Sequence, residues 1–129
     1  MKNIPISISH VHAGFPSPAE DYMDPSIDIN EYLVKNPPAT FFIRVRGHSM
    51  VNAGIYDNDI LVVDRSVKPK NKSIVVCILN GDFAVKRLSI KGKDIKLISE
   101  NSNYPNISIS SLDDFEVWGV VTYNIHQHV

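Results

Sequence analysis

The sequence has very little cysteine, no long apolar run and almost no net charge. Its one cysteine, Cys77, cannot form an intrachain disulfide, and its place in the apolar run 74–79 predicts a small, buried core residue. Thirteen basic and 14 acidic residues give a formal charge of -1, which provides no long-range field to attract DNA or an anionic membrane. We therefore expect a reducing, cytoplasmic location and no direct contact with DNA or a membrane.

Targeting segments are also lacking. No apolar stretch approaches the roughly 18 residues that a membrane-spanning helix requires. The residues Val11-His12-Ala13 have the spacing that a signal peptidase reads, but residues 1–10 contain lysine, asparagine, proline and serine where an apolar region should lie. We therefore predict no signal peptide. The length of 129 residues is enough for one domain with a core of modest size.

What is present divides into an N-terminal arm, residues 1–38, and a β-rich domain, residues 39–129. In the arm, Asp28 is a candidate N-cap with Glu31 three residues later, and an Asn-Pro-Pro run follows. A capping pair before such a stop predicts one short helix over about residues 29–35. The arm is otherwise expected to be irregular.

The domain consists of short runs rich in β-branched and aromatic residues. The turns Asn80-Gly81-Asp82 and Lys91-Gly92-Lys93 favour hairpins, so the runs on either side of them predict a meander. Short strands at this spacing predict a mainly β, twisted and partly closed fold rather than a parallel sheet. The predicted strands are 40–45, 60–63, 73–79, 83–90, 95–99, 107–109 and 115–125.

Ser49 is a candidate nucleophile. It follows the predicted strand and Gly47, at a point where the backbone can turn sharply and present a hydroxyl together with its own amide N–H. That geometry suits a nucleophile beside an oxyanion hole. The alternative is that Gly47-His48-Ser49 is a turn that simply ends a strand.

Lys86 is a candidate general base. In a strand it shares one face with Ala84 and Leu88, so its ammonium has apolar neighbours. A lysine with the reference pKa near 10.4 needs that pKa lowered by roughly three units to act as a base at pH 7, and apolar burial lowers it. The alternative is a lysine at an exposed strand edge, or one whose stem alone is buried.

These residues are part of a larger resemblance, which covers nearly the whole chain from Ala13 to about Thr122. In order and spacing the sequence resembles the UmuD family, which belongs with the LexA-like self-cleaving Ser-Lys peptidases. The motifs that carry this resemblance are Phe15-Pro16-Ser17-Pro18-Ala19, Gly47-x-Ser49-Met50, Asp57-x-Asp59-x-Leu61-x-Val63-Asp64, Phe83-x-Val85-Lys86-Arg87-Leu88 and Gly119-Val120-Val121.

The resemblance implies roles for particular residues. Ser49 would be the nucleophile and Lys86 the general base, without an Asp-His pair. The backbone amides of Ser49 and His48 would form the oxyanion hole. The peptide bond between Ala13 and Gly14 would be the one that is cut, and its small residues would let the backbone approach a cleft closely. His48 departs from the small or acidic residue expected beside the serine.

The resemblance also implies a role in SOS mutagenesis. A RecA filament on single-stranded DNA would promote self-cleavage, and the truncated homodimer would join a UmuC-type Y-family polymerase as a subunit of an error-prone translesion enzyme. A LexA-like repressor is disfavoured, because the residues before Ala13 are too few for a helix-turn-helix domain. The competing interpretation is a β-fold binding module or polymerase accessory subunit in which Ser49 and Lys86 are inert.

Two further groups could hold a metal ion. Asp57 and Asp59 precede a predicted strand, where an aspartate pair is more typical of a turn. His126 and His128 lie near the C-terminus, and two ligands without a third make a poor site. We therefore predict no metal ion and no cofactor.

Overall fold

The computed structural model describes residues 3–7, 11–16 and 23–129. The chain forms two compact units, residues 1–35 and residues 36–129. In the first unit, β1 (Asn3–Ser7) pairs antiparallel with β2 (Met23–Asp28), and α1 (Ile29–Leu33) follows directly. In the described part of the chain, α1 and the other helical turns are all too short to cross a membrane.

The short helix of the arm is confirmed, and its cap is the predicted one. The Asp28 side chain accepts a hydrogen bond from the Glu31 backbone N–H at 3.3 Å. The expectation that the rest of the arm is irregular was wrong for β1 and β2. Both strands contain a proline, Pro5 and Pro25, and a residue without an N–H weakens the sequence signal of a strand.

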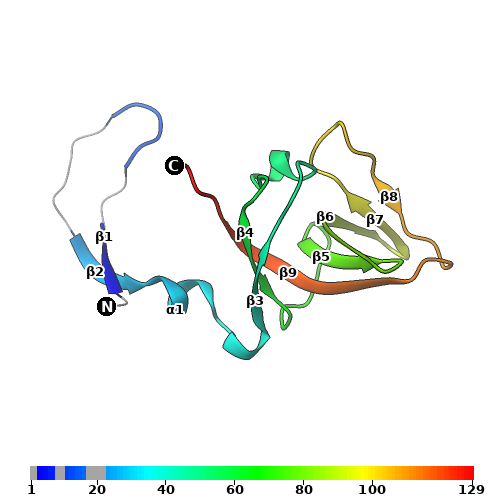
Figure 1. Cartoon of the computed structure of the whole chain (residues 1–129), viewed down its shortest axis with the longest axis horizontal. Helices are drawn as coiled ribbons and strands as arrows, with labels where there is room; N and C mark the ends of the chain where they lie inside the picture. The colour runs from blue at the N-terminus through cyan, green and yellow to red at the C-terminus, as the bar shows by residue number, and fades with distance from the viewer. Residues whose placement is uncertain (1–2, 8–10, 17–22) are drawn as a thin grey trace. The chain divides into compact units, whose positions relative to one another are not determined.

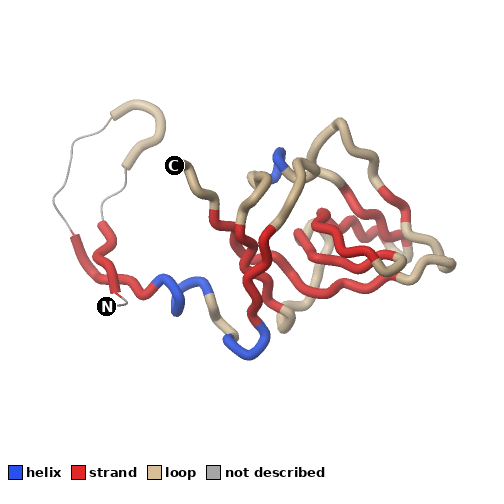
Figure 2. Tube along the Cα trace, in the orientation of Figure 1, coloured by secondary structure: helices blue, strands red, loops and turns tan. Residues whose placement is uncertain are grey.

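The second unit contains a seven-stranded antiparallel sheet in the order β3-β4-β9-β5-β6-β7-β8 (Figures 1 and 2). The predicted mainly β fold is confirmed, and the sheet remains open with β3 and β8 at its edges. Two 3₁₀ turns accompany it, η1 (Pro37–Ala39) and η2 (Val51–Ala53). The strands are β3 (Thr40–Arg44), β4 (Ile60–Asp64), β5 (Ile74–Leu79), β6 (Asp82–Lys91), β7 (Asp94–Ile98), β8 (Ile107–Ser108) and β9 (Phe115–Ile125).

The predicted meander is β5-β6-β7, and its turns have the expected chemistry. Asn80 and Gly81 have φ values of 51° and 89° between β5 and β6, and Gly92 has 62° between β6 and β7. Asparagine and glycine are the residues that adopt these left-handed conformations at least cost. The turns therefore fix the register of β6 with β5 and with β7, and this register determines which residues lie beside Lys86.

Two hydrophobic clusters use alternate residues of β5. Val76 belongs to the cluster that holds Met50, while Val75 and Cys77 belong to the one that holds Leu88 and Leu97. Alternate residues of a strand point to opposite faces, so β5 is buried on both. Cys77 is fully buried and free, as predicted.

The apolar stretch of β9, residues 115–121, packs on these clusters. Phe115 and Val117 contact the cluster around Val75, whereas Trp118 and Val121 contact the one around Met50. Both faces of this stretch therefore contribute to the core. Ile125, at the end of β9, is more exposed than the apolar residues of this stretch, with 44% of its surface accessible.

Candidate active site

Ser49 lies in a tight turn that follows β3, and the turn is held at both ends. Gly47 has a φ of +102°, a conformation that favours glycine, and its backbone N–H donates to Asp57 Oδ1 at 2.7 Å. On the other side of Ser49, the Met50 side chain is buried in the core with 3% of its surface exposed. The half-buried Ser49 hydroxyl is therefore carried by a fixed backbone.

The backbone amides beside Ser49 are available to a ligand. The His48 carbonyl oxygen accepts from Asn101 Nδ2 at 2.8 Å and from the Val51 N–H at 3.4 Å. Among the described residues, by contrast, no acceptor is bonded to the backbone N–H of His48 or of Ser49. Free amides near a nucleophile are the donors that stabilise an oxyanion.

Lys86 lies on β6 opposite Val75 of β5 and is partly buried. Burial lowers the pKa of its ammonium below the ordinary value, and the charge of the Cys77 thiolate opposes this shift. Burial in turn raises the pKa of the Cys77 thiol, an effect that the positive charge of Lys86 opposes. Lys86 Nζ donates to Ser99 Oγ at 2.8 Å and lies 6.0 Å from the centre of the Tyr104 ring.

A single cavity of about 630 Å³ brings Ser49 and Lys86 together. Its walls are mostly apolar and include Trp118, whose ring centre is 6.4 Å from that of Phe83 in the same wall and 5.2 Å from that of Phe41. A cavity of this size with few polar groups fits several residues of an extended peptide. The lining residues are Ile43, Arg44, Val45, Arg46, Ser49, Val76, Phe83, Ala84, Val85, Lys86 and Trp118.

Ala13 and Gly14 belong to the first unit, in the described stretch 11–16. Both are exposed, as are their neighbours Val11 and Phe15 with 95% and 92% of their surfaces accessible. A peptide bond in an exposed, non-helical, non-strand segment is open to hydrolysis. Residues 17–19 of the same sequence motif lie outside the described residues.

The sequence analysis did not identify Ser99 and Asn101, which contact both halves of this site. A signal for Ser99 was present in the predicted hairpin. Once Arg87 pairs with Ile98, the next step of an antiparallel register places Lys86 opposite residue 99. No comparable local signal exists for Asn101, because its partner is 53 residues away in the chain.

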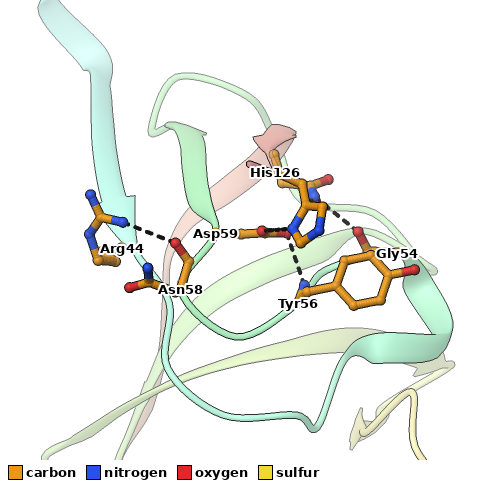
Figure 3. Close-up of polar contacts among 7 residues, drawn as sticks. Arg44, Gly54, Tyr56, Asn58, Asp59 and His126 are labelled. Carbon is orange, nitrogen blue, oxygen red and sulfur yellow. Dashed lines mark hydrogen bonds and ion pairs between the residues drawn. The ribbon is translucent and has the colours of Figure 1, made fainter. Parts of the chain in front are cut away.

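The two aspartates near β4 accept hydrogen bonds that hold neighbouring segments of the chain. Asp57 holds the Gly47 turn. Asp59, with 2% of its surface exposed, accepts from the Tyr56 N–H and Asn124 Nδ2 at 2.9 Å each, and lies 2.5 Å from His126 Nδ1 (Figure 3). The described residues contain no group of three or more candidate metal ligands.

The pKa of Asp59 is lowered, although burial by itself would raise it. The hydrogen bonds from Tyr56, His126 and Asn124, with the charge of His126, outweigh burial. A carboxyl group whose folded pKa is depressed contributes stability above its ordinary pKa, near 4, and this contribution is lost as pH falls through the folded value. The pair joins the end of β9 to the start of β4 (Figure 3).

We therefore expect Asp59→Asn to lower the free energy of unfolding by about 2 kcal/mol at pH 7, the typical worth of hydrogen bonds to a charged group. Urea unfolding at pH 7 and at pH 3 measures the free energy of unfolding of both proteins. The difference in this free energy between the variant and the wild type should be smaller at pH 3. Asp57→Asn is the matched control, since Asp57 is exposed and its variant should show a smaller change. An equal loss at both pH values would contradict the role assigned to the Asp59 charge.

The fold and the cavity together define a candidate serine hydrolase site: an open antiparallel sheet that carries a serine on a glycine turn and a partly buried lysine at one hollow. The sequence model described as peptidase S24-like matches residues 5–122. The chain therefore belongs to the S24-like peptidase family, and the resemblance to its UmuD-type members is confirmed.

Relatives of this family match most of the chain. Protein MucA of Salmonella typhimurium is 40% identical over 127 residues, which cover 98% of this chain and 86% of MucA. Protein SamA of Salmonella typhimurium strain LT2 is 41% identical over 123 residues, covering 95% and 85%. The LexA repressor of Ralstonia nicotianae is 36% identical over 114 residues, covering 88% of this chain and 52% of the repressor.

Proposed function

We propose that this protein is a self-cleaving serine peptidase of the SOS response that cuts its own Ala13-Gly14 bond. Ser49 is the nucleophile, Lys86 the general base, and the backbone amides of Ser49 and His48 the oxyanion hole. The observation that supports this most directly is the shared cavity, which Ser49 and the lysine of lowered pKa both line.

The chemistry follows from these groups. Neutral Lys86 accepts the Ser49 hydroxyl proton while Oγ attacks the Ala13 carbonyl carbon. The carbonyl oxygen becomes an oxyanion, which the two amides stabilise. The ammonium then returns the proton to the Gly14 nitrogen, the C–N bond breaks, and an ester joins Ala13 to Ser49. Water, deprotonated by Lys86, hydrolyses that ester and restores the serine.

The direct test is the mass of the product. Purified protein incubated at mildly alkaline pH should slowly give a fragment whose N-terminal residue is Gly14, together with the peptide 1–13. Intact mass and N-terminal sequencing identify both. A chain that stays whole, alone and with a RecA filament, would instead support the competing role of a non-catalytic binding module or polymerase accessory subunit.

The cellular role that we propose follows the family. A RecA filament on single-stranded DNA stimulates the cut in the cytoplasm, and the truncated dimer becomes a subunit of an error-prone translesion polymerase with a UmuC-type Y-family partner. DNA is contacted through these partners, since the chain has a formal charge of -1. The slow removal of the arm then determines when the polymerase is assembled.

The proposed dimer yields its own prediction. Exposed apolar side chains remain in the second unit at Phe42 and Ile125, with 58% and 44% of their surfaces accessible, and such side chains favour association. We expect the chain to sediment at about twice its 14.5 kDa mass before and after cleavage. A monomer at all micromolar concentrations, in both forms, would exclude the dimer.

Mixing two inactive chains tests whether the cut can pass between subunits. A Ser49→Ala chain retains the cleavage site, and a chain altered at Ala13 retains the nucleophile. Product from the Ser49→Ala chain in the mixture is expected if one subunit cuts the other. Absence of product while mixed dimers form would leave cleavage within one chain.

A further inference from the structure

The segment that follows β7 contacts both halves of the proposed catalytic pair. From Ser99 to Asn101 the chain leaves the sheet with Ser99 and Glu100 still beside β6. Ser99 Oγ accepts from Lys86 Nζ at 2.8 Å, and Asn101 Nδ2 donates to the His48 carbonyl at 2.8 Å. We propose that Ser99 and Asn101 are positioning residues: Ser99 orients the amine of Lys86, and Asn101 orients the backbone amide of the oxyanion hole. This proposal rests on the function proposed above.

Ser99 is built into the structure as an acceptor for Lys86. Its side chain is buried, with 8% of the residue surface exposed, and its Oγ donates to the Pro105 carbonyl oxygen at 3.3 Å. A carbonyl oxygen only accepts, so the single hydroxyl hydrogen is used there and the lone pairs of Oγ face the lysine. The Ser99 backbone N–H donates to Asn106 Oδ1 at 3.1 Å, which fixes the residue further.

An acceptor-only neighbour has a consequence for the neutral amine. The amine has two N–H groups and one lone pair, and Ser99 takes up one N–H without competing for the lone pair. The lone pair then stays available for the proton of the Ser49 hydroxyl. A donor at the same place would block the base instead of aiming it.

Asn101 acts on the other half of the site. The carbonyl of His48 and the N–H of Ser49 belong to one planar peptide unit and point in opposite directions. Holding the His48 oxygen at 2.8 Å therefore also fixes the direction of the Ser49 N–H. That N–H is one of the two proposed oxyanion donors, and such donors act through their fixed orientation.

Backbone and side-chain contacts hold the segment itself. The Glu100 carbonyl accepts from the Asn52 N–H at 2.8 Å, and the Glu100 carboxylate pairs with Arg87 Nε at 3.1 Å. Asn101 Oδ1 accepts from the Asn103 N–H at 3.0 Å. One short segment thus ties the serine turn and the lysine strand to each other.

The experiment compares rates of self-cleavage over pH 7 to 10. Ser99→Ala should lower the rate on the high-pH plateau by about 10- to 100-fold, the effect of misplacing a reacting group by about an ångström. Its midpoint should move to lower pH, because the ammonium loses an acceptor. Ser99→Thr keeps the hydroxyl and should restore most of the rate. The exposed Ser108→Ala is the matched control.

Asn101→Asp separates the contact with His48 from the shape of the loop. It keeps the oxygen that accepts from Asn103 and removes the N–H donor to His48. We expect a plateau about tenfold lower or more, as in Asn101→Ala, with the midpoint unchanged. Asn103→Ala, whose backbone contact remains, should cleave like the wild type. Wild-type rates in Asn101→Asp, or in Ser99→Ala on the plateau, would overturn the proposal.

A measurement that does not depend on cleavage tests the role of Ser99 separately from the proposed peptidase activity. In a Ser49→Ala background, NMR titration of the labelled Lys86 side chain should give a lower midpoint with Ser99→Ala than without it. The other ionisable groups near Lys86 are the Cys77 thiol, the Tyr104 phenol, and Arg44 and Arg46 in the cavity wall. An unchanged midpoint refutes the Ser99 contact, whereas an uncut wild type refutes the peptidase.

Thermal unfolding of each variant shows whether it folds. If Ser99→Ala fails to fold, the comparison rests on Ser99→Thr and on the two Asn101 variants, which alter an incompletely buried side chain. A folded Ser99→Thr with a wild-type plateau and a slow, folded Asn101→Asp support the proposal. A folded Ser99→Thr with a slow plateau and a folded Asn101→Asp with a wild-type plateau refute it.

Discussion

Ser49→Ala is expected to abolish self-cleavage, lowering its rate by on the order of 10⁴-fold or more, as removal of a serine nucleophile does in other peptidases. The alanine retains the backbone amide and the turn held by Gly47 and Asp57, so the oxyanion donors and the fold should be preserved. Only the attacking oxygen is lost. The amount of fragment beginning at Gly14, followed over days by mass spectrometry, measures the effect.

Lys86→Ala should have an effect of similar size, because nucleophile and base act as a unit and their losses do not add. The double variant should therefore be no slower than either single one. Lys96→Ala is a matched control, since Lys96 is an exposed lysine on the neighbouring strand β7. Persistent cleavage in both Ser49→Ala and Lys86→Ala, or a fragment with a different first residue, would remove these residues from the mechanism.

The rate of self-cleavage should rise with pH, by about tenfold per unit, as the neutral fraction of Lys86 grows. The rise should level off below the ordinary pKa of lysine, because burial lowers the pKa of Lys86. The direction follows from the role of the group: a base works in its deprotonated form, so protonation at lower pH inactivates it. Single-turnover rates from pH 6 to 10.5 give the midpoint.

His48 supplies the control for this profile. It is exposed and next to Ser49, the proposed nucleophile, and an imidazole base would give a rise centred near pH 6.5. We expect His48→Ala to leave the midpoint unchanged, because the proposed contribution of this residue is its backbone amide. If the cleavage rate of the wild type already reached its plateau at pH 7, and His48→Ala lost this plateau, the base would be His48.

The sequence predicted the elements of the second unit well, because their signals are local. Runs of β-branched residues marked the strands, and Asn80-Gly81 marked a turn whose left-handed conformation those residues adopt readily. The capping pair Asp28 and Glu31 likewise marked α1. Prediction was wrong for β1 and β2, where prolines weaken the strand pattern.

The candidate site was only partly visible in the sequence. Ser49 beside Gly47 and Lys86 among apolar residues were recognisable as types of residue that suit the chemistry, and family resemblance joined them. They are 37 positions apart in the chain, and they meet at one cavity because the fold lines it with residues of both β3 and β6. The contacts of Ser99 and Asn101 were not predicted, since neither residue type signals a role without its partner.

By itself, the sequence determined the mainly β class, the strands and turns of the second unit, the family, and which side chains are candidates for a nucleophile and a base. These properties depend on the order of neighbouring residues. The tertiary structure decided that Lys86 is desolvated, that the His48 and Ser49 amides have no bonded acceptor among the described residues, and that the segment after β7 contacts both Lys86 and the turn that carries Ser49. Burial and hydrogen-bond geometry depend on residues far apart in the chain, which only folding brings together.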